Sequence, residues 1–157
     1  MKRIALLVVF CLITTLAGYA QTPSKVETKV NNIVKKYENT AGVECMTVVR
    51  GGGLEMVKMM FNKQFGKEFM RGVRSITIID YTEASATVCQ SLRKEIDTFT
   101  SLLEEYDLEG SKEFAEHSYI RSFGTSSGEN TLSDFVIALE NSDSKVIMYM
   151  AGVIKLE

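Results

Sequence analysis

The 157-residue chain has no tryptophan, one proline, one histidine and three cysteines. The lack of tryptophan disfavours the large aromatic platforms on which extracellular sugar sites often stack their ligands. The lone histidine, His117, would have to serve any Ser-His-Asp or Cys-His device, and no Gly-x-Ser-x-Gly sequence accompanies it. Zinc sites usually take several His or Cys ligands. We therefore predict no catalytic residues, no metal site and no cofactor.

An excess of basic residues is also missing. The chain has 18 Lys and Arg against 20 Asp and Glu, which gives a formal net charge of −2. No basic cluster stands out, so nucleic acid and anionic membrane surfaces are disfavoured as partners. The length suits one domain that can bury a core without metals or cross-links.

The first 20 residues, MKRIALLVVFCLITTLAGYA, have the pattern of a Sec signal peptide. Lys2 and Arg3 form its charged start, and Gly18-Tyr19-Ala20 forms its small-residue cleavage site. The apolar stretch is too short to span a bilayer as an ordinary helix. No cysteine follows Leu-Ala-Gly, so a lipid anchor is disfavoured. We predict an exported, soluble protein of the periplasm or the extracellular space, without a membrane span in its mature form.

The mature chain is predicted to be one α+β domain of residues 21–157. It keeps two cysteines, Cys45 and Cys89, in a compartment that permits disulfides. Both lie in apolar surroundings of their predicted elements. Two buried free thiols and a Cys45–Cys89 disulfide therefore both remain open.

Apolar spacing predicts three helices and five strands. The helices are expected at about 24–38, from Leu54 to Phe65, and from a cap at Thr82 to an end near 107–110. The strands are expected at 43–49, 73–81, 118–123 and in the two arms of a hairpin between Leu132 and Val153. Residues Gly124–Asn130 are expected to form a flexible loop.

This order predicts an α+β fold with one mixed sheet of about five strands. The first two strands are joined by a helix, so a right-handed parallel β-α-β unit is expected. The last three strands are expected to form a C-terminal antiparallel meander. Three helices should pack mainly on one face.

The C-terminal hairpin is the clearest pattern in the chain. With Asn141–Ser144 as its turn, Glu140 faces Lys145, and Phe135, Ile137 and Leu139 share one face with Val146, Met148 and Met150. We predict that this face is the core. The other face, with Val136, Ile147 and Tyr149, is predicted to be a partly apolar interaction surface that the first helix, a second copy or a partner covers. Tyr149→Glu is then expected to weaken association and to leave the monomer folded.

The element order and the ending SDFVIALENSDSKVIMYMAGVIKLE resemble the exported bacterial family known as domain of unknown function 4252 (DUF4252). The resemblance covers nearly the whole mature chain through packing patterns. It implies a Gram-negative origin and a role in the cell envelope. The family has no established activity, so the resemblance implies no functional residues.

Two further patterns have a chemical interpretation beside a structural one. Arg50-Gly51-Gly52-Gly53 lies between a strand and a helix, as phosphate loops do, but it lacks their Gly-Lys-Ser/Thr ending. Methionines at 56, 59, 60, 148 and 150 are soft ligands of the kind that hold Cu(I). Met60, Met148 and Met150 fall on predicted core faces, so a packing role is favoured for them.

The sequence therefore favours a non-catalytic binding domain of the cell envelope. Its expected partner is an envelope protein or a second copy in a homodimer. The alternative is a small-ligand-binding or hydrolytic domain with a pocket near Arg50, His117 and the Gly124–Asn130 loop.

Overall fold

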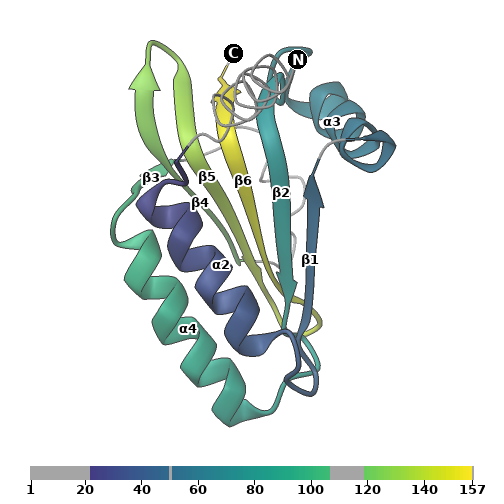
Figure 1. The fold of residues 1–157 in the computed structure, drawn as a ribbon, viewed down its shortest axis with the longest axis vertical. Coiled ribbons are helices and arrows are strands. Elements are labelled where there is room, and N and C mark those ends of the chain that lie inside the picture. The colour runs from purple at the N-terminus through teal and green to yellow at the C-terminus, as the bar shows by residue number, and fades with distance from the viewer. Residues whose placement is uncertain (1–21, 50, 107–118, 157) are drawn as a thin grey trace, which may run out of the picture.

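Helices and strands make up most of the computed structural model, which describes residues 22–49, 51–106 and 119–156 (Figure 1). The predicted signal peptide, Arg50 and His117 lie outside these residues. The element order is α2 (Lys25–Tyr37), β1 (Glu44–Val49), α3 (Gly52–Phe65), β2 (Gly72–Asp80), α4 (Ala86–Thr100), β3 (Glu104–Tyr106), β4 (Tyr119–Gly128), β5 (Thr131–Glu140) and β6 (Lys145–Lys155). This confirms the predicted α+β class.

The described strands form one six-stranded sheet in the order β1-β2-β6-β5-β4-β3, and every neighbouring pair is antiparallel. The predicted parallel pairing of the first two strands is wrong. Glu44 faces Asp80 and Val49 faces Ser75. The reason is that α3 does not cross back along the sheet. It lies beyond the end of β1 (Figure 1), so β2 starts at the end of the sheet where β1 finishes.

The third helix is shorter than predicted. Its N-cap is Ser85, whose hydroxyl accepts a hydrogen bond from the Val88 amide, and the helix ends at Thr100. The apolar spacing that continues to Tyr106 belongs to a turn and to strand β3, which pairs with β4. The predicted flexible loop is also wrong for Gly124–Gly128, which is the end of β4.

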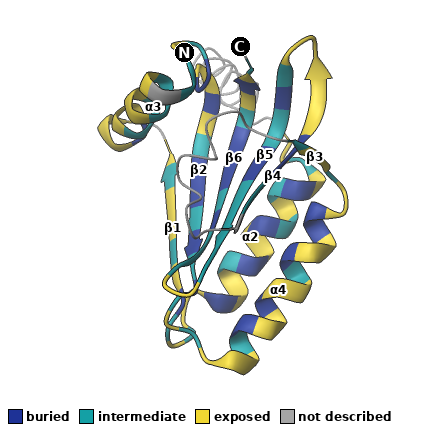
Figure 2. Cartoon of the chain, turned by 180° about the vertical axis from the view of Figure 1, so that it is seen from behind, coloured by how far each residue is buried: buried dark blue, intermediate teal, exposed yellow. Residues whose placement is uncertain are grey.

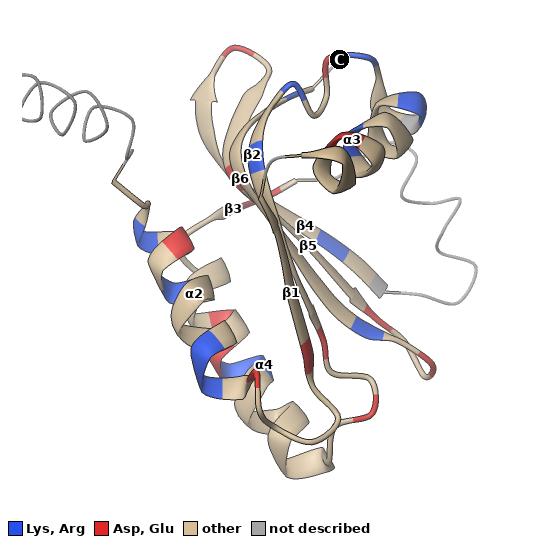
Figure 3. Ribbon diagram, turned by 45° about the vertical axis from the view of Figure 1, so that its right-hand side comes forward, with Lys and Arg blue, Asp and Glu red and all other residues tan. Residues whose placement is uncertain are grey.

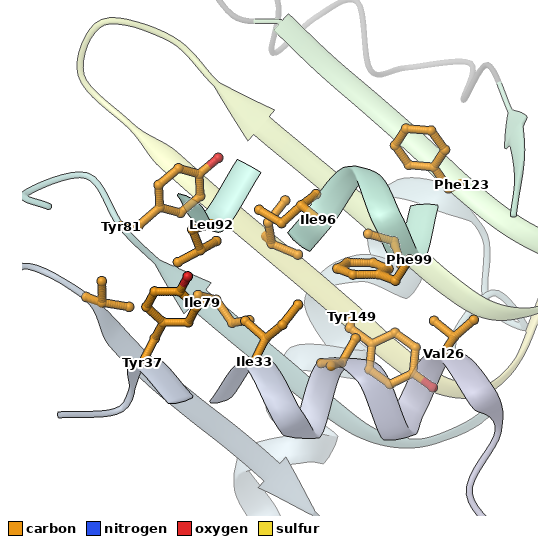
Figure 4. Close-up of a cluster of buried hydrophobic side chains, with 14 of the residues drawn as sticks. Val26, Ile33, Tyr37, Ile79, Tyr81, Leu92, Ile96, Phe99, Phe123 and Tyr149 are labelled. Atoms are coloured by element: carbon orange, nitrogen blue, oxygen red, sulfur yellow. The ribbon is translucent and has the colours of Figure 1, made fainter. Parts of the chain in front are cut away.

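The sheet has an apolar cluster on each face, because side chains alternate along each strand. α2 and α4 cover the first cluster (Figure 4), and α3 lies over part of the second. In β6, Ile147 and Tyr149 belong to the first cluster, whereas Met148 and Met150 belong to the second. Two of the three described helices thus pack on one face, as predicted.

The predicted register of the hairpin is confirmed. Glu140 pairs with Lys145, and the three pairs that follow match the prediction. The side-chain oxygen of Asn141 accepts hydrogen bonds from the amides of Asp143 and Ser144, at 2.8 and 2.6 Å. This local bonding is what short polar residues supply in tight turns. The register shifts once, between Ser133 and Phe135, where Asp134 has a φ of +52°.

Candidate functional site

The predicted interaction surface lies inside the protein. Val136, Ile147 and Tyr149 are 0, 1 and 2% exposed, because α2 and α4 cover this face of the sheet (Figure 4). From the sequence we expected the first helix, a second copy or a partner to cover this face, and the structure shows that the first helix, α2, does so together with α4. These residues do not form an accessible docking surface. The prediction that Tyr149→Glu leaves the monomer folded is replaced by its opposite, because the change would bury a carboxylate.

A polar cluster joins the start of α2 to the sheet. The Tyr149 hydroxyl donates to Asp134 Oδ1 at 2.6 Å, and the Ser24 hydroxyl donates to the same oxygen at 2.7 Å. Ser24 Oγ also accepts from the Glu27 amide at 2.9 Å as the N-cap of α2. The sequence places Asp134 and Tyr149 on the same face of the hairpin, but the third member, Ser24, lies 110 residues away from Asp134.

The surroundings of the Tyr149 hydroxyl determine its protonation state. Burial, and then the hydrogen bond to the Asp134 carboxylate, hold the pKa of Tyr149 far above its usual value of 10.0. Tyr149 therefore stays protonated at neutral pH and acts as a hydrogen-bond donor, not as a base or nucleophile. Nearby, Glu27 Oε2 is buried without a hydrogen bond and faces Arg74 Nη2 at 3.5 Å. The arrangement anchors a helix and offers no reacting group.

A small cavity lies between α4 and the sheet. Its volume is about 130 Å³, and its lining includes Tyr81, Arg93, Asp97, Arg121 and Glu140. Both arginines of its lining form ion pairs, Arg93 with Glu140 and Arg121 with Glu105. Burial raises the pKa of the Tyr81 hydroxyl, which Arg93 partly offsets. The volume suits water or a small ion, since pockets for drug-sized ligands begin at about 300 Å³.

The structure describes only part of the pocket that the sequence offered as an alternative site. Arg50 and His117 lie outside the described residues. Of the Gly124–Asn130 segment, only Glu129 and Asn130 form a turn, and Asn130 has a φ of +52°. Residues 125–130 are exposed.

Both described cysteines are free thiols. Cys89 is buried, and Cys45 is half-buried at the edge of the first cluster. Burial, followed by the charge of Glu38, raises the pKa of the Cys45 thiol. A raised pKa reduces its thiolate fraction, and hence its reactivity, at neutral pH. Of the two interpretations left open from the sequence, the structure shows free thiols.

Most of the exposed large apolar side chains belong to two neighbouring elements. Seven large apolar residues are exposed in the described part of the chain, and five of them belong to β1 and α3. These five are Met46, Val49, Met56, Met59 and Met60, with exposures between 54 and 68%. We call them the β1–α3 patch. α3 contacts β1, and Figure 2 shows both elements with mostly exposed positions.

The patch corrects the sequence analysis at Met60, which was predicted to be core and is 64% exposed. In α3 the buried or half-buried apolar residues are Leu54, Val57, Phe61 and Phe65. The Phe61 ring stacks on those of Phe65 and Phe69, and the rings of Phe65 and Phe69 are tilted against each other. The helix is thus apolar on more than one side, which is a sequence signal for a second contact surface.

An open groove of about 600 Å³ runs beside the patch along α3. Met59 lines it together with charged and polar side chains of α3 and the turn that follows. Among them Lys58 pairs with Glu55 at 3.4 Å, and Arg71 pairs with Glu68 at 2.7 Å. An apolar patch with a charged rim is the usual make-up of a protein-docking surface.

Two features are absent from the described residues. These residues contain no group of three His, Cys, Asp or Glu side chains placed to hold a metal ion. They also contain no helix with the length and apolar character needed to cross a membrane. Comparison with known proteins gave no significant match to a family model, to a curated protein or to a solved structure.

Proposed function

We propose that the protein is a non-catalytic interaction domain of the cell envelope, and that its β1–α3 patch binds a protein partner, either an envelope protein or a second copy of this chain. One observation carries the proposal: five of the seven exposed large apolar side chains of the described residues lie on these two neighbouring elements. Single apolar residues scattered over a surface need no explanation, but five on two neighbouring elements, beside a groove lined by charged side chains, indicate a binding surface.

The composition of the patch supports a protein as its partner. Three of its members are the α3 methionines Met56, Met59 and Met60. Methionine has a flexible, polarizable side chain, and it is frequent on surfaces that adapt to protein partners. Strand β1 is an edge of the sheet among the described strands, and an edge strand can bind an extended peptide or another strand through its backbone.

The location in the proposal rests on the N-terminal sequence and on the resemblance to DUF4252. A signal peptide at residues 1–20 would export the chain, and the family is found in Gram-negative bacteria. The expected location is therefore the periplasm or the extracellular space.

Site-specific photocrosslinking tests the proposal. A photoreactive residue replaces Met59, which is 68% exposed in the patch, or Leu102, which is 52% exposed outside it. Each protein is mixed with a Gram-negative envelope extract and irradiated. We expect the probe at 59 to capture a discrete protein that the probe at 102 does not capture. Adding Met56→Ser and Met60→Ser should reduce this capture at least about fivefold.

Two results would overturn the proposal. One is capture of the same proteins at equal yield from positions 59 and 102. The other is a specific thermal shift with a small molecule that His117→Ala abolishes, which would favour the ligand-binding or hydrolytic alternative.

A further inference from the structure

Among the described residues, strand β1 is an edge of the sheet that lacks the usual features preventing pairing with another chain. It pairs with β2 through six consecutive residue pairs, and no bulge interrupts them. The pairings of β2 with β6, β4 with β5 and β5 with β6 each contain a register shift. Within β1 there is no proline and no lysine, and Glu44 at its start is its only charge (Figure 3). Natural edges usually carry such devices to prevent pairing with another chain.

The opposite edge shows the contrast. β3 has three residues, two of which are Glu104 and Glu105. A short, charged strand offers little to a partner strand. Of the two edges of the described sheet, β1 is therefore the one that suits pairing with another strand.

We infer that the occupant of the β1 edge is a second copy of this chain, whose β1 pairs antiparallel with the first across a two-fold axis at Thr47. This inference rests on the proposed function, and it names the partner of the same patch. In this register Met46 faces Val48 of the other copy, and Cys45 faces Val49. The two sheets become one continuous sheet, and the interface is isologous.

The sequence of β1 fits itself in this register. Every directly opposed pair within the described strand is apolar with apolar, except Thr47, which faces Thr47. Such cross-strand pairs stabilise a sheet, whereas like charges opposite one another destabilise it. The two Glu44 residues would lie about 20 Å apart, at 3.4 Å per residue. In the sequence Arg50 directly follows the strand, so antiparallel pairing opposes ends of opposite charge.

Helix α3 supplies the remaining contact. Figures 1 and 2 both show it beyond the β1 edge, beside the end of the strand at Val49. Antiparallel pairing brings the start of the partner's β1 to this end. Apolar surface of α3 that the partner covers there would favour association by about 25 cal/mol for each Å² buried.

Disulfide trapping tests both the partner and the register. The protein is residues 21–157, which include every described element, with Cys45→Ser and Cys89→Ser. Thr47→Cys places two thiols on the axis, where opposed Cα atoms are about 4.5–5.5 Å apart, within disulfide reach. Val49→Cys is the matched control, because it lies on the same face of β1 and its two copies would be about 14 Å apart. We expect a disulfide-linked dimer with Thr47→Cys and at least tenfold less with Val49→Cys.

Restoring Cys45 in the Val49→Cys protein turns this negative control into a positive one. Val49→Cys with native Cys45 should now form the linked dimer, because these two positions face each other in the proposed register. Sedimentation of the unlinked wild-type chain should show a dimer, and Met46→Lys with Val48→Lys should give a folded monomer, as circular dichroism checks. Equal disulfide linking of Thr47→Cys and Val49→Cys would overturn the inference. It would also be overturned if the wild-type chain sediments as a monomer and Thr47→Cys forms no linked dimer. If the chain is a monomer but the photoreactive probe at position 59 still captures another protein, the proposed function stands. If the probe captures no protein, the inference and the proposed function are both wrong.

Discussion

At the scale of single residues, Asp134 shows how a local irregularity serves the tertiary structure. Its φ of +52° accompanies the register shift in β5 and turns its carboxylate toward Tyr149 and Ser24. Asp is one of the few residues that tolerate this conformation. The bulge therefore gives one carboxylate to both a strand residue and a helix cap.

We predict that Tyr149→Phe lowers the free energy of unfolding by about 1.5–3 kcal/mol, the usual cost of a hydrogen bond to a charged group. Urea denaturation measures the change. Tyr106→Phe is the control, because the Tyr106 hydroxyl donates to the exposed Glu104 carboxylate at 2.6 Å. It should change stability by less than about 0.5 kcal/mol. Equal effects at both positions would show that the buried cluster contributes nothing.

Alkaline pH should weaken this contribution. The folded pKa of Tyr149 is raised, so its stabilisation is complete below the unfolded value of 10.0 and is lost as the pH rises above it. The loss should be about 1.4 kcal/mol per pH unit above pH 10. Tyr149→Phe lacks this titration, so the stability gap between wild type and variant should narrow from pH 10 to 11.5. Parallel stability curves over that range would contradict the assignment.

At the scale of elements, the junction of β2 and β6 depends on a close backbone approach. Gly152 has a φ of +116°, and a Cβ there would lie 2.3 Å from the Gly72 carbonyl oxygen. This contact falls beside the register shift between Val73 and Ser75. A side chain at position 152 would therefore push the two strands apart.

Gly152→Ala should lower the free energy of unfolding by at least about 2 kcal/mol, through backbone strain and the clash. Thermal and urea denaturation measure it. Gly52→Ala at the start of α3 is the matched control, because a Cβ there meets nothing within 4 Å. It should be neutral or stabilising by up to about 1 kcal/mol, since alanine is the better helix former. If Gly152→Ala changed the free energy of unfolding as little as Gly52→Ala does, the close approach of β2 and β6 would not contribute to stability.

At the scale of the whole molecule, stability should fall from the middle of the sheet to its edges. β6 lies between β2 and β5, and its residues Met150, Ala151 and Ile154 are at most 1% exposed. β1 and β3 each have a single neighbouring strand. The described helices are also unequally shared between the faces, because α2 and α4 cover one face and α3 lies over part of the other (Figure 1).

Hydrogen–deuterium exchange should follow this gradient. We expect the amides of β6 to exchange slowest, near the rate set by global unfolding, and those of β1 and β3 to exchange at least about tenfold faster in dilute protein. If two copies pair through β1, raising the protein concentration should slow amide exchange in β1 alone. Uniform protection across the sheet in dilute protein would contradict the gradient.

The sequence by itself determined the local elements. Period-2 alternation and a turn of short polar residues set the hairpin register from Glu140 and Lys145 to Phe135 and Met150. Helical spacing located α2 and α3, because an amphipathic stripe is a property of neighbouring residues. The α+β class followed from the order of these elements.

Only the tertiary structure decided which face of the hairpin is covered. Alternation tells which side chains share a face, but both faces here carry apolar residues, and the choice depends on helices that lie far away in the sequence. α2 and α4 bury Val136, Ile147 and Tyr149. The face predicted to be the core is covered in part, because Phe135 and Met150 are buried but Ile137 and Met148 are half-buried. The antiparallel β1–β2 pairing and the exposed Met60 were decided in the same way, because they depend on where α3 packs.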